Sequence, residues 1–115
     1  MKKLLKIWFI ILLTLVLNIN SLVSYSAPPI FTKAPDEAFA LSEDMKLDVL
    51  LVFTASWCAS CQVMKNDIHT NLDNFQNTII CYVDYDEYKS MAIQYKVKVL
   101  PDYRIYRNKI GRAHV

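Results

Sequence analysis

Two cysteines three residues apart follow closely on a long apolar stretch. The stretch is Asp48–Thr54 (DVLLVFT), and the cysteines are Cys58 and Cys61. A continuous apolar run rich in β-forming residues predicts a strand buried on both faces. A helix is predicted to follow, from about Cys58 to about residue 70. The apolar residues at helical spacing in it are Val63, Met64 and Ile68. The chain is therefore expected to turn from a buried strand into a helix at the cysteine pair.

The rest of the sequence alternates between predicted helices and strands. A helix is predicted from Pro35, because proline suits a first helical turn and acidic residues follow it. Further strands are predicted at residues 78–84 (TIICYVD) and 102–107 (DYRIYR), with a helix at 86–96 between them. This alternation predicts an α/β fold, and 115 residues are enough for one domain.

The first 26 residues are typical of a secretory signal peptide. Three lysines precede an apolar run from Ile7 to Leu17, which is shorter than the roughly 20 residues that span a bilayer. Ser24 and Ser26 would occupy the −3 and −1 positions of the cleavage site, so that Ala27 begins the mature chain. An uncleaved signal that anchors the protein in the membrane is the alternative. Residues 27–34 are expected to form an extended leader before a domain at 35–108.

The charge balance gives no sign of a nucleic-acid partner. All 11 acidic residues follow Ala27, but only 10 of the 13 basic residues do, and they form no cluster. Export would place the protein in an oxidising compartment, where disulfides persist. The third cysteine, Cys81, lies in a predicted strand, and we expect it to be a buried small hydrophobic residue. A second redox role is the alternative for it.

A cysteine pair at the start of a helix suits disulfide exchange. Cys58 would meet unpaired N–H groups and the positive end of the helix dipole, which favour the attacking thiolate. Cys61 would lie one turn further along the same face of the helix. For Cys58 to attack a disulfide and Cys61 to resolve the product, Cys58 must be exposed and Cys61 must lie behind it. Two alternatives remain for the cysteine pair. It could form a purely structural disulfide, or it could bind a metal ion together with Cys81 and His69. Haem attachment is excluded because Gln62, not His, follows the pair.

Two landmarks together resemble the thioredoxin superfamily. The segment Trp57-Cys58-Ala59-Ser60-Cys61 after a strand is similar to its W-C-x-x-C motif, and Val99-Leu100-Pro101-Asp102 is similar to its cis-proline loop. The resemblance covers residues 46–108 and, in this exported setting, is greatest to the C-terminal domain of DsbD-type electron transporters. It implies an α/β thioredoxin-like fold with a central mixed sheet and flanking helices.

The resemblance also implies a role for each site residue. Cys58 would attack and Cys61 would resolve, with Ala59 and Ser60 between them and Trp57 shielding the pair. Pro101, in cis, would hold a backbone edge near Cys58, where a substrate chain pairs with Leu100. No metal or other cofactor is implied, because the redox-active disulfide itself carries the electrons.

Three positions bear on the direction of electron flow. The superfamily places a buried acid six residues before the first cysteine, where this chain has Val52. Lys65, one turn beyond the pair, is an alternative means of lowering a thiol pKa. Asp102 stands after the cis-proline, where threonine is usual, and would add charge beside the substrate groove.

We therefore expect an exported, periplasmic or extracytoplasmic, thiol–disulfide oxidoreductase that acts on cysteines or disulfides of substrate proteins. Reduction or interchange is favoured over oxidation, and a reductase there would need an electron donor in the membrane. The alternative is a non-catalytic thioredoxin-fold module that binds a partner or assists metal handling or cytochrome maturation.

The last residues match a sequence of a different origin. Residues 110–115 (IGRAHV) match the translation of a widely used sequencing adapter, whose preceding bases fit a codon for Lys109. We expect residues 109–115 to be non-native, and the fold to lack its last strand and helix. The strand at 102–107 would then be an unpaired edge of a marginally stable domain. A genomic continuation that encodes IGRAHV would contradict this.

Overall fold

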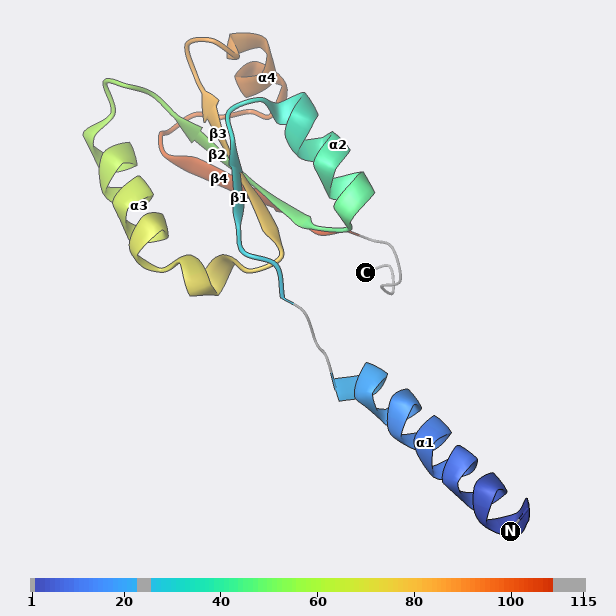
Figure 1. The fold of residues 1–115 in the computed structure, drawn as a ribbon. Coiled ribbons are helices and arrows are strands. Elements are labelled where there is room, and N and C mark those ends of the chain that lie inside the picture. Colours follow the sequence, from blue (N-terminus) through green and yellow to red (C-terminus); the bar gives the residue numbers. More distant parts are fainter. Residues whose placement is uncertain (1, 23–25, 109–115) are drawn as a thin grey trace.

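Four strands form a mixed sheet in the computed structural model, which describes residues 2–22 and 26–108 (Figure 1). The strand order is β1-β3-β2-β4, in which β1 and β2 run parallel to β3 and β4 runs antiparallel to β2. The strands are β1 Ile30–Thr32, β2 Asp48–Thr54, β3 Thr78–Asp84 and β4 Asp102–Tyr106. The predicted α/β class with a mixed sheet is confirmed.

Helices cover both faces of this sheet (Figure 1). The helices α2 Pro35–Met45 and α4 Lys89–Gln94 pack on one face, through Ala38 and Ala92. The helix α3 Ala59–Thr70 packs on the other through Ile68, and the short 3₁₀ helix η1 Leu72–Phe75 follows it. Helices therefore pack on both faces of the sheet over its central strands.

The central strand β2 is buried along nearly its whole length. Successive strand side chains point to opposite faces. Val49, Leu51 and Phe53 accordingly join the core under α2 and α4, while Leu50 and Val52 join the core under α3. An apolar run without alternation is what burial on both faces requires, and the predicted bounds of this strand are confirmed.

The helix predicted at residues 86–96 is shorter than expected. The Asp84 carboxylate accepts hydrogen bonds from the backbone N–H groups of Asp86 and Glu87, which holds these residues in a turn. At the other end Lys96 adopts a left-handed conformation, with a φ of 56°. Helical residues are therefore restricted to α4, and a local carboxylate–backbone contact overrides the apolar periodicity.

The segment expected to be an extended leader contributes a strand. Residues 30–32 form β1, which pairs with β3 in the register Ile30↔Ile79. Ala27 is held as well, because its N–H donates to the Asn77 side chain and its carbonyl accepts from the Asn77 N–H, both at 2.8 Å. Three residues give too short a pattern to identify a strand from sequence, and only pairing with β3 reveals it.

The N-terminal helix α1, Lys2–Leu22, stands apart from the sheet (Figure 1). Its apolar side chains are largely exposed, with Leu5 at 70% and Phe9 at 71%. Within the residues that the structure describes, no helix combines the length and apolar character needed to cross a membrane. Two predictions, Ser24 in the cleavage site and the non-native origin of residues 109–115, fall outside the described residues.

The strand predicted at 102–107 is β4, and it lies at the edge of the sheet in the described part of the chain. Tyr103 and Ile105 are 61% and 58% exposed. The expected absence of a further strand and helix concerns chain beyond Asn108, outside the described residues.

One buried hydrogen bond fixes the end of α2 against β2. The Ser42 hydroxyl, which is 9% exposed, donates to the Leu47 carbonyl at 2.6 Å. We expect Ser42→Ala to lower the free energy of unfolding by about 1–3 kcal/mol, because the carbonyl would lose its partner away from water. Urea unfolding measures this, with exposed Ser90→Ala as the control at about 0.5 kcal/mol or less. Equal effects of the two changes would contradict the prediction.

Candidate active site

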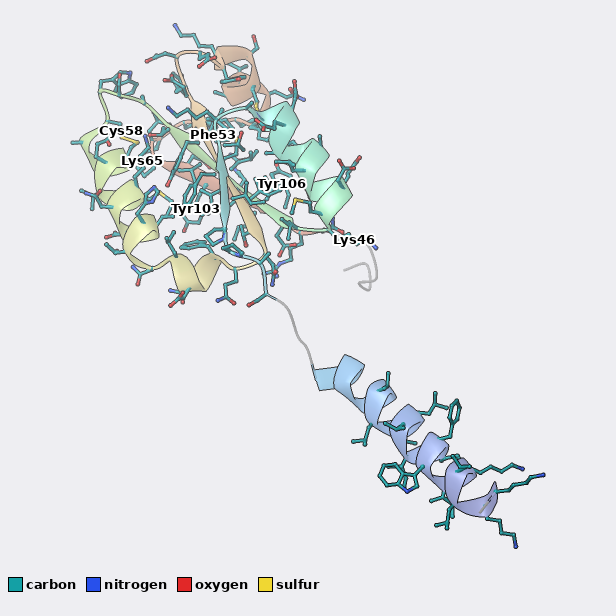
Figure 2. All side chains as sticks on the ribbon, in the orientation of Figure 1. Lys46, Phe53, Cys58, Lys65, Tyr103 and Tyr106 are labelled. Carbon is teal, nitrogen blue, oxygen red and sulfur yellow. A yellow bond between two sulfur atoms is a disulfide. The ribbon has the colours of Figure 1, made fainter. Side chains whose placement is uncertain are left out.

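The loops that follow β2 and β3 meet at one edge of the sheet. Thr54 and Asp84 end these parallel strands side by side, and the Tyr85 N–H donates to the Thr54 carbonyl at 2.8 Å. The carboxyl ends of parallel strands are where α/β sheets commonly form binding sites. In this protein the edge carries Trp57 and the cysteine pair, and Figure 2 shows Cys58 at the start of α3.

Cys58 and Cys61 are joined by a disulfide bond. Cys58 is the N-cap residue of α3, and its sulfur accepts a hydrogen bond from the Cys61 N–H at 3.2 Å. This places the sulfur at the positive end of the helix dipole, as the sequence predicted. Cys58 is 7% exposed and Cys61 is 1% exposed. Cys58 is thus the more accessible sulfur, although less exposed than expected, because Ala55, Tyr85 and Leu100 pack around the pair.

Ser60 contacts the Cys58 sulfur through its side chain. Its Oγ lies 3.4 Å from Cys58 Sγ. A disulfide sulfur carries no hydrogen, so the Ser60 hydroxyl must be the donor. The same donor would favour a thiolate at Cys58 after reduction, because hydrogen bonds to a charged form stabilise it.

Trp57 stands beside the pair and is held by residues that the sequence analysis did not include. Its Nε1–H donates to the Asp86 carboxylate at 2.9 Å, and its ring meets Tyr85 edge-on at 6.5 Å. The indole is nevertheless 65% exposed. Trp57 therefore forms a wall next to Cys58, and its role in shielding the pair stays a prediction.

A groove of about 620 Å³ opens over Cys58. The Leu100–Pro101 peptide bond is cis, as the resemblance implied, and Leu100 packs against the buried cysteine cluster. The groove is lined by Trp57, Cys58, Ala59, Ser60, Tyr85, Val97, Lys98 and Leu100. A larger groove of about 780 Å³ lies between α3, η1 and β4 but contains neither cysteine, so chemistry rather than size identifies the site.

The charges that the sequence placed near the pair are engaged elsewhere. The Lys65 Nζ lies 5.1 Å from the centre of the Tyr82 ring. The Asp102 carboxylate binds Arg104 through both oxygens, at 3.0 and 3.2 Å, and this contact raises the pKa of the Arg104 guanidinium. Asp102 therefore brings no uncompensated charge to the groove, contrary to expectation. Val52, at the position of the superfamily's buried acid, is 1% exposed among apolar side chains.

Sequence reasoning missed four groove or supporting residues, namely Tyr85, Asp86, Val97 and Lys98. Asp86 was assigned to the start of a helix, and Tyr85 fell between that helix and the preceding strand. The signal that could have found them is the end of a second parallel strand at Asp84, because the following loop must lie beside the loop that carries the cysteines.

Cys81 and His69 cannot join the pair in a metal site. Cys81 belongs to the core under α2 and α4. His69 lies on the opposite face, stacked on Phe31 at 4.7 Å with its Nε2 3.4 Å from the Tyr82 hydroxyl. Across the described residues, no three His, Cys, Asp or Glu side chains are grouped so as to hold a metal ion.

Cys81 is a free cysteine with no exposed surface. Burial, with a smaller contribution from the Glu37 carboxylate, raises the pKa of the Cys81 thiol to about 12. The same thiol in the unfolded chain has a pKa of about 8.5. The buried residue therefore fits the predicted structural role, and its pKa makes stability depend on pH.

We expect the free energy of unfolding to fall as pH rises from about 9 towards 12. In that window the unfolded chain loses the Cys81 proton while the folded chain keeps it, which favours unfolding by about 1.4 kcal/mol per pH unit. Urea unfolding between pH 8 and about 10.5 tests this by comparison with Cys81→Ala. The free energy of unfolding of the variant should fall less steeply with pH, by about 1.4 kcal/mol per pH unit. Identical slopes for the two proteins would contradict it.

A mixed sheet with a disulfide-bonded C-x-x-C pair at a helix N-terminus, packed against the residue before a cis-proline, is the arrangement of thiol–disulfide oxidoreductases of the thioredoxin fold. The sequence model of the thioredoxin family matches residues 32–114. The chain belongs to the thioredoxin family and is a thiol–disulfide oxidoreductase. This family acts on the cysteines and disulfides of proteins.

Known thioredoxins share both sequence and fold with this chain. It is 33% identical to thioredoxin of Mus musculus over 81 residues, which cover 69% of this chain and 75% of the mouse protein. It is 31% identical to thioredoxin of Homo sapiens over 78 residues, covering 64% and 74%. A solved thioredoxin from Halobacterium salinarum superposes with a TM-score of 0.58 at 23% identity, covering 74% of this chain and 75% of that one, and so supports the fold.

Proposed function

We propose that this protein is an exported reductase or isomerase of protein disulfides. The observation that carries the proposal is the Cys58–Cys61 disulfide at the start of α3, with Cys58 opening on a groove. A pair with a purely structural role would not need its more accessible sulfur at a helix dipole, facing a groove large enough for a peptide segment.

The proposed reaction begins with the reduced pair. The Cys58 thiolate attacks one sulfur of a substrate disulfide, so that a mixed disulfide forms and a substrate thiolate leaves. Cys61, as a thiolate, then attacks Cys58 Sγ, which restores the Cys58–Cys61 disulfide and releases the second substrate sulfur as a thiolate that takes a proton from water. Two electrons pass from the pair to the substrate, and the pair must then be reduced again by a thiol or dithiol donor.

Trp57, Ala59, Ser60, Leu100 and Pro101 are proposed to support this exchange. Ser60 would stabilise the thiolate through its hydroxyl. Leu100 and the cis bond before Pro101 place a stretch of backbone beside Cys58. An extended substrate could pair with such a backbone edge.

Export is supported by the N-terminal segment. Lys2, Lys3 and Lys6 precede the apolar part of α1, and α1 lies apart from the sheet (Figure 1). Ala27, the residue proposed to start the mature chain, is hydrogen-bonded to Asn77 of the domain. In an extracytoplasmic compartment the reducing equivalents would come from an electron donor in the membrane.

The potential of the Cys58–Cys61 pair tests the proposal. The protein is equilibrated in glutathione buffers, and the reduced fraction is read by alkylation and mass. A potential near the roughly −270 mV typical of thioredoxin supports a reductase. A potential near the roughly −120 mV of a strong oxidant such as DsbA overturns the preferred direction. A pair that stays oxidised well below about −300 mV is a structural disulfide and overturns the function.

A further inference from the structure

We propose that the groove over Cys58 selects substrate segments with an acidic side chain two residues from the reacting cysteine, and that Lys98 selects them. This inference rests on the proposed function, because it concerns the substrate of the same site. It names a specificity residue that the sequence analysis did not identify.

Among the residues that the structure describes, Lys98 is the one charged side chain that lines the groove. The other walls are aromatic, as at Trp57 and Tyr85, or aliphatic, as at Val97 and Leu100. A substrate segment that fills this groove is therefore expected to be largely apolar, with one position facing an ammonium group.

The charge of Lys98 is uncompensated in the described part of the chain. In that part of the chain, Asp102 forms an ion pair with Arg104. Asp102 is the carboxylate nearest in sequence to the cis-proline, and it therefore does not pair with Lys98. Asp86, which is not among the residues that line the groove, accepts the Trp57 Nε1–H. Lys98 is exposed and makes no ion pair or side-chain hydrogen bond with any described residue.

The backbone around Lys98 sets which substrate residue it meets. Within the described residues, the N–H and C=O groups of Lys98, Val99 and Leu100 form no backbone hydrogen bond, so this stretch offers an edge to an extended peptide. Lys98 and Leu100 lie two residues apart, and both line the groove. A substrate whose cysteine lies beside Leu100 and Cys58 thus presents the residue two positions away to Lys98.

The expected preference is modest because the pair would be solvent-exposed. Exposed ion pairs are weak, so an acidic residue should favour reaction by about threefold to fivefold at low salt. The preference should shrink as salt is added, since charges in water are screened over about 8 Å at physiological ionic strength.

The test uses synthetic peptides of one apolar sequence around a single cysteine. They carry Glu, Gln or Lys two residues before the cysteine, or in a second set two residues after it. Each peptide is held as a mixed disulfide with the neutral thiol 2-mercaptoethanol. The full chain is reduced with dithiothreitol, desalted, and mixed with each peptide, and the second-order rate of peptide-thiol release is measured. One dithiol is oxidised for each peptide disulfide that is reduced.

Two variants with the same change in net charge separate the groove from the overall charge. One of the two peptide sets should show the preference for Glu. In that set, Lys98→Glu should make the Lys peptide react faster than the Glu peptide. Lys96→Glu, on the same exposed loop but outside the groove, should keep the original preference. Lys98→Gln should make the Glu and Gln peptides react at equal rates, and reaction of both peptides also shows that the domain still folds.

The outcomes distinguish this inference from the proposed function. Equal rates for all peptides in both sets, or equal shifts in Lys98→Glu and Lys96→Glu, overturn the role of Lys98 and leave the reductase intact. A reduced chain that reacts with no peptide disulfide overturns the proposed function and this inference with it.

Discussion

Replacing Cys58 by Ser is expected to abolish the reduction of protein disulfides. On the proposed mechanism the attacking atom is the Cys58 sulfur, which caps α3 and borders the groove. A serine hydroxyl at that position is not ionised near neutral pH and forms no mixed disulfide, so activity should fall by on the order of 10³-fold or more. Insulin reduction by dithiothreitol-driven turnover, followed as precipitation of the freed chains, measures this loss.

Two further variants separate the roles of the three cysteines. Cys61→Ser should leave Cys58 able to attack but unable to be released, so that a covalent adduct with the substrate accumulates on non-reducing gels. Cys81→Ala is the matched control, because Cys81 lies in the core on the far side of β3 from α3, and it should keep the activity of the folded protein. Retained insulin reduction in Cys58→Ser would mean that another group performs the attack.

Replacing Phe53 by Ala is expected to have the largest effect on stability. Phe53 lies in the central strand (Figure 2) and has no exposed surface. Its ring meets that of Tyr95 edge-on at 5.7 Å. Removing its ring leaves a cavity between β2 and the α4 side, and changes of this kind cost about 3–5 kcal/mol. Because the free energy of unfolding of native proteins is only about 5–15 kcal/mol, this is a large share of the stability.

Urea unfolding at neutral pH compares this variant with Val63→Ala. Val63 is 60% exposed on α3, so its truncation should change the free energy of unfolding by about 0.5 kcal/mol or less. A loss in Phe53→Ala no greater than that in Val63→Ala would show that the core under α2 and α4 does not hold the sheet together.

The sequence determined the parts of this protein that depend on local pattern. The run at residues 48–54 identified β2 within its bounds, because a strand buried on both faces needs apolar residues at every position. The position of Cys58 at the start of a helix followed from the adjoining periodicity. The pair of landmarks at Cys58 and Pro101 indicated the thioredoxin fold, which the family match supports.

The tertiary structure decided what depends on contacts between distant segments. β1 exists because residues 30–32 pair with β3, and α4 is short because Asp84 holds the turn before it. The groove joins Trp57 and Tyr85 to Lys98 and Leu100, residues from three separate loops. Asp102 was expected to charge this groove, but it pairs with Arg104, while Lys98 stands free in the described part of the chain. Such pairings are fixed by side-chain geometry in space, which the spacing of residues along one chain does not encode.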